Sequence, residues 1–202
     1  MGLLISLEGP DGCGKSTQIA FIKEYYESKG KEVLVAREPG GTVISEKIRD
    51  ILLDASNAKM DYRCEMFLYA AARAQLVGEV IKPALNAGKV VIMDRFVDSS
   101  AVYQGIARGL GVDTVYEVND IGLDGVVIDL TIHLDLPAEV GLSRKKSQHE
   151  LDRMEQEGLD FHERVAKGYR DLAAMHPERI VTIDATKSPE EIRDIIMEHL
   201  PK

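Results

Sequence analysis

The sequence predicts an α/β fold in which five parallel strands form one sheet and helices cover both of its faces. Two observations predict it. Five short runs of residues are apolar throughout, as is typical of strands buried on both faces of a parallel sheet. Between these runs, apolar residues recur at helical spacing, and strands that alternate with helices indicate a parallel sheet.

The expected elements follow one another in a regular order. Strands are expected at residues 3–7, 33–36, 90–93, 130–134 and 179–183, because each is a short apolar run. Helices are expected at residues 15–29, 45–53, 62–86, 99–106, 112–123, 159–175 and 189–200. Gly30 and Gly88 follow two of these helices, at the position where glycine commonly ends a helix.

The 202 residues contain no sequence repeat and no Gly/Ser-rich linker, so we expect a single domain over residues 1–202. Residues 141–158 are strongly charged and are expected to form a short lid. The apolar fraction of 45% and the charged fraction of 29% are typical of a folded globular protein.

Composition also excludes several classes of partner. No apolar run approaches the roughly 20 residues that cross a membrane, so no membrane association is expected. The formal net charge of −9 disfavours binding to a nucleic-acid backbone. Cys13 and Cys64 have neither a metal-binding nor a disulfide spacing, which favours the reducing cytoplasm.

The first apolar run leads into a glycine-rich turn that opens the first helix. Residues 9–16 match G-x-x-x-x-G-K-[ST], the phosphate-binding loop of the P-loop NTPase fold. Its glycines let backbone N–H groups converge on a phosphate, Lys15 reaches the β- and γ-phosphates, and the Ser16 hydroxyl binds Mg²⁺. We therefore expect ATP to bind to Gly9, Pro10, Asp11, Gly12, Cys13, Gly14, Lys15, Ser16 and Thr17.

An acidic and a basic residue follow the third expected strand directly. Asp94 and Arg95 therefore emerge at the carboxyl edge of the sheet, where open α/β sheets bind their ligands. Asp94 is expected to hold Mg²⁺ through water, and Arg95 to clamp an anionic acceptor. A purely structural ion pair is the alternative, and the position opposite the phosphate-binding loop makes it the weaker one.

Several motifs resemble those of bacterial-type thymidylate kinases and occur in the same order along the chain. The set is similar to the subtype of that family that carries its catalytic arginines in the lid. The matching segments are Glu8-Gly9-x-Asp11-Gly12-x-Gly14-Lys15-Ser16, Arg37-Glu38-Pro39-Gly40-Gly41-Thr42, Tyr69-Ala70-Ala71-Ala72-Arg73, Asp94-Arg95-Phe96-x-Asp98-Ser99-Ser100-x-x-Tyr103-Gln104-Gly105, Glu150-Leu151-Asp152-Arg153-Met154-Glu155 and Ile183-Asp184-Ala185-Thr186.

The resemblance implies that the chain transfers the γ-phosphate of ATP to dTMP with the help of Mg²⁺, and that it forms a homodimer. It implies that Tyr69 stacks on thymine, where the family usually has Phe, and that Arg73 contacts the base. Tyr103 is implied to lie near the sugar and to disfavour a 2′-hydroxyl, while Ser100 and Gln104 line the same pocket. A core position remains the alternative for Tyr69.

The resemblance also assigns the phosphate end of the acceptor. Asp11 is implied to lie near the 3′-hydroxyl. Arg49 and Arg95 are implied to clamp the acceptor phosphate, with Glu38 beside them, although a surface charge is the alternative for Arg49. The peptide bond before Pro39 is expected to be cis, as in the family.

The phosphate-binding loop contains no arginine, so the charge that develops on the transferred group requires another cation. Besides Lys15 and Arg95, the candidates are Arg144 and Arg153 in the expected lid. A solvated loop is the alternative interpretation of the basic run 144–149. No general base is required, because the acceptor phosphate is already ionised at neutral pH.

Two alternative functions remain open. The chain could be a kinase of another nucleotide or deoxynucleoside, or a P-loop ATPase that acts as a switch without a small acceptor. A GTPase is disfavoured, because no Asn-Lys-x-Asp motif for guanine is present. The ATPase alternative leaves Arg73, Arg95 and Gln104 without a role.

Overall fold

A computed structural model describes residues 2–146 and 152–201. Within these residues, five parallel strands form one sheet in the order β2-β3-β1-β4-β5. The strands are β1 (Leu3–Glu8), β2 (Val33–Arg37), β3 (Val90–Asp94), β4 (Leu130–Asp135) and β5 (Ile180–Asp184). All five expected strands and the α/β class are confirmed, with bounds that differ by one residue.

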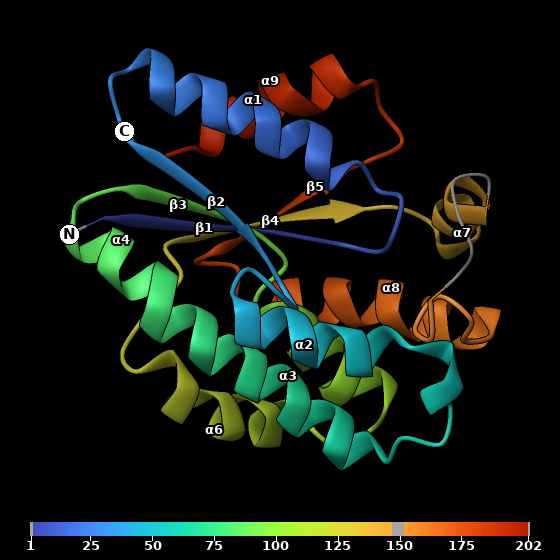
Figure 1. Ribbon diagram of the computed structural model, residues 1–202. Helices are drawn as coiled ribbons and strands as arrows, with labels where there is room; N and C mark the ends of the chain where they lie inside the picture. Colours follow the sequence, from blue (N-terminus) through green and yellow to red (C-terminus); the bar gives the residue numbers. More distant parts are fainter. Residues whose placement is uncertain (1, 147–151, 202) are drawn as a thin grey trace.

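Helices cover both faces of the sheet. Figure 1 shows α1 (Lys15–Ser28) and α9 (Pro189–His199) on one face, with a second group of helices on the other. Those are α2 (Val43–Leu53), α3 (Tyr62–Leu76), α4 (Lys82–Asn86), α6 (Val112–Leu123) and α8 (Leu159–Met175). The expected helices 112–123 and 159–175 coincide with α6 and α8.

Successive strand residues point to opposite faces, and both faces are apolar. Ile5 and Leu7 pack with Ile22 of α1 in one core cluster, whereas Leu4 packs with Leu76 of α3 in another. A third cluster fills the space between α8 and the segment that follows β3. The continuous apolar strands of the sequence are thus explained by burial on both sides.

Two helical segments have the wider π geometry. The expected helix 62–86 is continuous but contains the π-helical segment η2 (Val77–Ile81) between α3 and α4. Pro83 lies just beyond it and has no N–H to donate, so an ordinary α-helical hydrogen bond is missing there. The expected helix 99–106 consists of α5 (Val97–Ser100) and the π-helical segment η3 (Ala101–Ala107).

The alternative interpretation of the basic run 144–149, a solvated loop, is wrong for the start of that run. The helix α7 (Ala138–Lys146) extends through Arg144, because Lys and Arg are good helix formers once a helix has begun. Residues 147–151 of the expected lid lie outside the described residues. Among residues 2–146 and 152–201, no helix has the length and apolar character needed to cross a membrane.

The sheet brings three chain segments together at one edge. Arg37 at the end of β2 and Leu7 near the end of β1 both pair in register with Asp94 at the end of β3. The loops that follow these strands therefore meet above the carboxyl edge of the sheet, as expected for an open α/β fold.

Candidate active site

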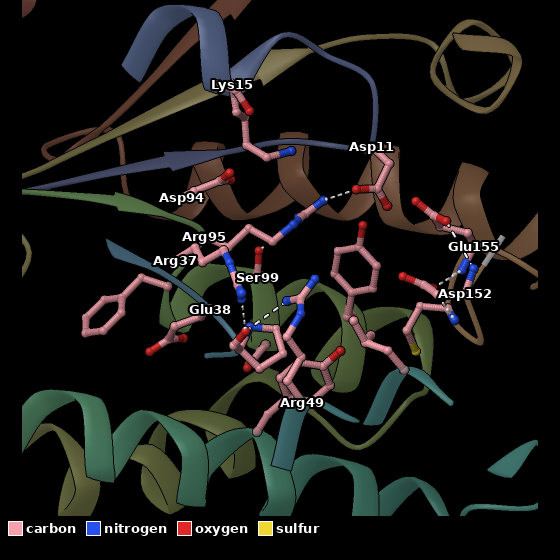
Figure 2. A pocket seen from close by; sticks show the side chains of 18 of the residues that line it. Asp11, Lys15, Arg37, Glu38, Arg49, Asp94, Arg95, Ser99, Asp152 and Glu155 are labelled. Carbon is pink, nitrogen blue, oxygen red and sulfur yellow. Dashed lines mark hydrogen bonds and ion pairs between the residues drawn. The ribbon is translucent and has the colours of Figure 1, made fainter. Parts of the chain in front are cut away.

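A cavity of about 360 Å³ opens at this edge of the sheet. Figure 2 shows Arg95 reaching toward Asp11, with Lys15 on one side and Glu38 and Arg49 on the other. The structure brings together nearly all of the residues that the sequence analysis singled out. Those that line the cavity are Asp11, Gly12, Gly14, Lys15, Ser16, Thr17, Glu38, Pro39, Arg49, Tyr69, Arg73, Asp94, Arg95, Ser100, Tyr103 and Gln104.

The loop between β1 and α1 has the geometry of a phosphate-binding loop. Gly9, Gly12 and Gly14 have φ values of 140°, 74° and 97°, which side chains other than glycine rarely adopt. A Cβ atom on Gly12 would lie 2.7 Å from the carbonyl oxygen of Gly141, so α7 approaches the loop closely. Lys15 at the start of α1 donates from Nζ to the carbonyl of Gly9 at 3.2 Å.

The backbone of Arg95 also has a left-handed conformation, with φ 68°. Such a value is uncommon for a residue with a side chain and requires support from its surroundings. The fully buried carboxylate of Glu8 provides it, because Oε1 accepts the next backbone N–H, that of Phe96, at 2.7 Å. The pKa of Glu8 is raised, mainly by burial and then by the charge of Asp98. Hydrogen bonds from Ser99 and Ser6 and the charge of Arg95 lower it, but they do not outweigh burial.

The Arg95 guanidinium is held by three partners. It donates to Oδ1 of Asp11 at 2.8 Å, to Oγ of Ser99 at 3.1 Å and to the hydroxyl of Tyr169 at 3.0 Å. Ser99 in turn donates to Glu8 at 2.5 Å. This arrangement fixes a positive charge between the phosphate-binding loop and the deeper part of the cavity, where an anionic acceptor would lie.

A magnesium ion fits the donors that the cavity provides. Ser16 at the start of α1 and Asp94 at the end of β3 both line it, and their side chains carry the oxygen donors. Across the described ranges 2–146 and 152–201, no group of three His, Cys, Asp or Glu side chains could hold a metal. Mg²⁺ suits such a sparse set, because it keeps several waters and usually binds one or two carboxylates together with substrate phosphates.

The deeper wall of the cavity is built around a buried ion pair. Arg73 is only 1% exposed and donates from Nε to Oε2 of Glu38 at 2.9 Å. It also donates to Oγ of Ser100 at 3.1 Å and contacts Asn119 of α6. Burial raises the pKa of Glu38 to about 7, against the lowering effect of Arg73. The pair can present fixed donors to a nucleobase without the mobility of a surface arginine.

Two buried polar atoms of this wall have no hydrogen-bond partner in the part of the chain that the structure describes. They are Oε1 of Glu38 and the hydroxyl of Tyr103. Buried polar groups are normally paired, so unpaired ones that line a cavity indicate a polar ligand.

The segment after β2 supplies further cations. The Glu38–Pro39 peptide bond is cis, as expected. Arg37 and Arg49 both donate to the carbonyl oxygen of Pro39, at 2.9 and 2.8 Å. Arg49 therefore points into the cavity rather than into solvent. Arg37 lines the cavity too, although the family motif that contains it did not assign it a role.

The two candidate lid arginines have different surroundings. Arg144 is exposed and donates from Nη1 to the carbonyl of Gly12 at 3.0 Å, beside the phosphate-binding loop. Arg153 is 6% exposed and donates to the carbonyl of Leu52 at 2.6 Å and to Glu65 at 2.7 Å. It is not among the cavity-lining residues, whereas its neighbours Asp152, Met154 and Glu155 are.

Comparisons with known proteins agree with this site. The family model described as thymidylate kinase matches residues 7–196. Thymidylate kinase of Thermoanaerobacter sp. (strain X514) is 49% identical over 203 residues, which cover 98% of this chain and 99% of that protein. Thymidylate kinase of Latilactobacillus sakei subsp. sakei (strain 23K) is 50% identical over 195 residues, with coverage of 95% and 91%.

A solved structure has the same architecture. The crystal structure of thymidylate kinase from Ehrlichia chaffeensis superimposes with a TM-score of 0.80 at 29% identity, and the match covers 99% of both chains. The five-stranded sheet with its phosphate-binding loop is therefore the P-loop NTPase fold. Full-length similarity in sequence and structure, together with the cavity described above, establishes that this chain belongs to the thymidylate kinase family.

Proposed function

We propose that this chain phosphorylates dTMP to dTDP, with ATP as the phosphoryl donor, in the cavity at the carboxyl edge of the sheet. One observation carries the proposal. Arg95 lies between a phosphate-binding loop and a buried wall of Arg73, Glu38 and Tyr103, so one cavity has a triphosphate end and a nucleoside end.

At the donor end, the backbone N–H groups of residues 9–17 and the start of α1 bind the ATP phosphates. The Lys15 ammonium neutralises charge on the β- and γ-phosphates. Mg²⁺, held by Ser16 and by Asp94 through water, would neutralise the remaining phosphate charge when it is bound.

At the acceptor end, Tyr69 stacks on the thymine ring and Arg73 donates to a base oxygen. The Tyr103 hydroxyl lies near C2′ of the sugar, and Ser100 and Gln104 line the pocket around the base. Arg49 and Arg95 bind the acceptor phosphate beside Glu38, and Asp11 accepts the 3′-hydroxyl.

Catalysis then consists mainly of alignment. The acceptor phosphate oxygen is ionised at neutral pH and needs no general base. Two anions must be brought into line, and the cations of Lys15, Arg95 and the lid reduce their repulsion. For the lid cation we favour Arg144 over Arg153, because Arg144 already contacts the phosphate-binding loop.

We further propose that residues 141–158 act as the lid of a single domain, and that the enzyme is a cytoplasmic homodimer. Exposed apolar side chains support the dimer: Val43 of α2, Phe67 of α3 and Ile121 of α6 are 74%, 57% and 87% exposed. The free thiols of Cys13 and Cys64 are compatible with a reducing compartment. Sedimentation at several concentrations tests the dimer.

An acceptor screen tests the function. ADP release is measured with ATP and Mg²⁺ while each nucleoside monophosphate and each deoxynucleoside is offered in turn. We expect stimulation by dTMP well above that by other acceptors. Stronger stimulation by another nucleotide or by a deoxynucleoside would favour the related-kinase alternative, and ATP hydrolysis that ignores every acceptor would favour the switch ATPase.

A further inference from the structure

The carboxylate of Glu65 lies behind the nucleoside end of the cavity and is fully buried. Two segments of the chain converge on it. Gln104 lies in η3 and Arg108 directly follows it, whereas Arg153 reaches Glu65 from the expected lid, residues 141–158. Glu65 does not line the cavity, but Gln104 does. The carboxylate therefore contacts a binding residue from outside the site.

All accepting positions of the Glu65 carboxylate are in use. Oε1 accepts from Nε2 of Gln104 at 2.8 Å and from Nε of Arg108 at 3.3 Å. Oε2 accepts from Nη2 of Arg108 at 3.2 Å and from Nη1 of Arg153 at 2.7 Å. Burial alone would raise the pKa of Glu65, but the hydrogen bonds from Arg108 and Gln104 and the charge of Arg108 outweigh it and lower the pKa. Glu65 is thus an ionised group that can only accept hydrogen bonds.

This state of Glu65 fixes the orientation of the Gln104 amide. An acceptor-only partner requires the NH₂ group of Gln104 to face Glu65, so Oε1 faces the opposite way. Gln104 is 1% exposed, so bulk solvent does not compete for either end of its amide. Within the described part of the chain, Oε1 of Gln104 receives no hydrogen bond, and the residue lines the cavity.

We propose that Glu65 is a specificity-determining positioning residue, which holds the carbonyl oxygen of Gln104 toward the nucleobase so that the site accepts pyrimidines with an N3–H donor. Thymine and uracil carry that donor, whereas N3 of cytosine is an acceptor and would face the same oxygen unpaired. The proposal rests on the proposed function, since it concerns the base of the acceptor nucleotide. Glu65 then determines whether a base with an N3–H donor or one with an N3 acceptor is bound. Other residues discriminate between thymine and uracil, which both carry the donor.

The test is the substitution Glu65→Gln, which conserves shape but replaces one acceptor oxygen by a donor. In the variant, Arg108 and Arg153 hold the oxygen of the new amide at position 65, so the NH₂ group of that amide faces Gln104. The Gln104 amide must then turn, and it presents its own NH₂ group to the base. The matched control is Arg108→Lys, which disturbs the same buried cluster but leaves Glu65 an acceptor. The measurement is kcat/KM for dTMP and dUMP, together with the dissociation constants of dTMP, dUMP and dCMP.

We expect Glu65→Gln to lower kcat/KM for dTMP and dUMP about 10- to 100-fold, the size of one lost buried hydrogen bond. The affinity for dCMP should not fall, so the preference for dTMP over dCMP shrinks by the same factor. Arg108→Lys should weaken all three nucleotides alike. An unchanged preference in Glu65→Gln would overturn the proposal.

A measurement on the unaltered protein covers the case in which Glu65→Gln does not fold. In ¹⁵N-glutamine-labelled protein, the Gln104 side-chain signal is assigned from its absence in Gln104→Met. Its NH₂ protons should stay protected from solvent exchange when dTMP binds, since they remain on Glu65. Loss of that protection on dTMP binding would overturn the proposal. Failure of the unaltered chain to phosphorylate dTMP would instead overturn the proposed function.

Discussion

The nucleoside wall and the phosphate side of the cavity use the same charged residue types in opposite ways. On the nucleoside wall, Arg73 and Glu38 are buried and paired before any ligand arrives. On the phosphate side, binding relies on backbone N–H groups of a glycine-rich loop and on Arg144, which is exposed. The two halves of one site therefore differ in how their charges are held.

The difference follows from what each half must recognise. A nucleobase offers a few directional donors and acceptors, so its partners must be fixed, and buried ion pairs fix them at the expense of desolvation. A triphosphate offers dispersed negative charge, which convergent N–H groups and mobile cations can neutralise. Substitutions on the nucleoside wall should thus affect stability, and substitutions in the lid should affect rate.

The largest expected effect is that of Arg73→Met. It removes the cation that faces Glu38 and leaves that carboxylate buried without its partner. Breaking a buried pair in this way costs about 3–5 kcal/mol of unfolding free energy, measured by urea denaturation. The control is Arg63→Met, whose partner Asp61 is exposed, and there the change should stay below about 1 kcal/mol. Equal losses in the two variants would contradict the comparison.

A smaller effect should appear on acidification. His133 is 1% exposed, and its ring stacks on that of Tyr169 with 5.1 Å between the ring centroids. The Tyr169 hydroxyl in turn accepts a hydrogen bond from Arg95. Burial lowers the pKa of His133 from 6.5 to about 4, although the charge of Asp135 opposes this. Because the folded pKa lies below the unfolded one, the unfolded state binds the proton first. The stabilisation is complete above pH 6.5 and is lost as the pH falls toward 4.

The substitution His133→Phe tests this contribution, since it keeps an aromatic ring against Tyr169 but cannot be protonated. Between pH 7 and pH 4, the variant should lose less unfolding free energy than the unaltered chain, by up to about 3 kcal/mol. Denaturation curves at four pH values measure the unfolding free energy of each variant. His199→Phe, on the exposed side of α9, is the control. If both variants follow the pH dependence of the unaltered chain, His133 is not the acid-sensitive group.

The fold and the phosphate side could be predicted from local sequence. The strands, the loop at residues 9–17 and the pair Asp94–Arg95 depend on spacing within one element and on the edge of the sheet at which that element ends. The family motifs placed Tyr69, Arg73 and Tyr103 in the pocket, and the structure brings them to the same cavity.

What could not be predicted depends on pairing between distant segments. The side chain of Arg153 is directed by Glu65, which lies 88 positions earlier in the sequence, and nothing local shows that it turns away from the cavity. Ser99, Asp152 and Glu155 line the cavity for a similar reason, because loops from separate elements converge there. The helix α7 was not predicted, because composition alone does not show where a charged helix begins.

The smallest expected change in stability, and the clearest change in rate, belongs to Arg144→Ala. Its side chain is exposed and donates to the Gly12 carbonyl of the phosphate-binding loop, so truncation removes a cation from the lid without opening a core. We expect kcat to fall about 10- to 100-fold, as for the loss of one group that stabilises transition-state charge, with an unchanged melting temperature. Arg153→Ala should show the reverse, with a lowered melting temperature and a smaller effect on kcat, because it anchors Leu52 and Glu65. Arg193→Ala on α9, where the arginine is half-buried and remote from the cavity lining, is the control and should change neither quantity. Near-normal kcat in both Arg144→Ala and Arg153→Ala would mean that the lid supplies no cation to the reaction, and that Lys15, Arg95 and Mg²⁺ suffice.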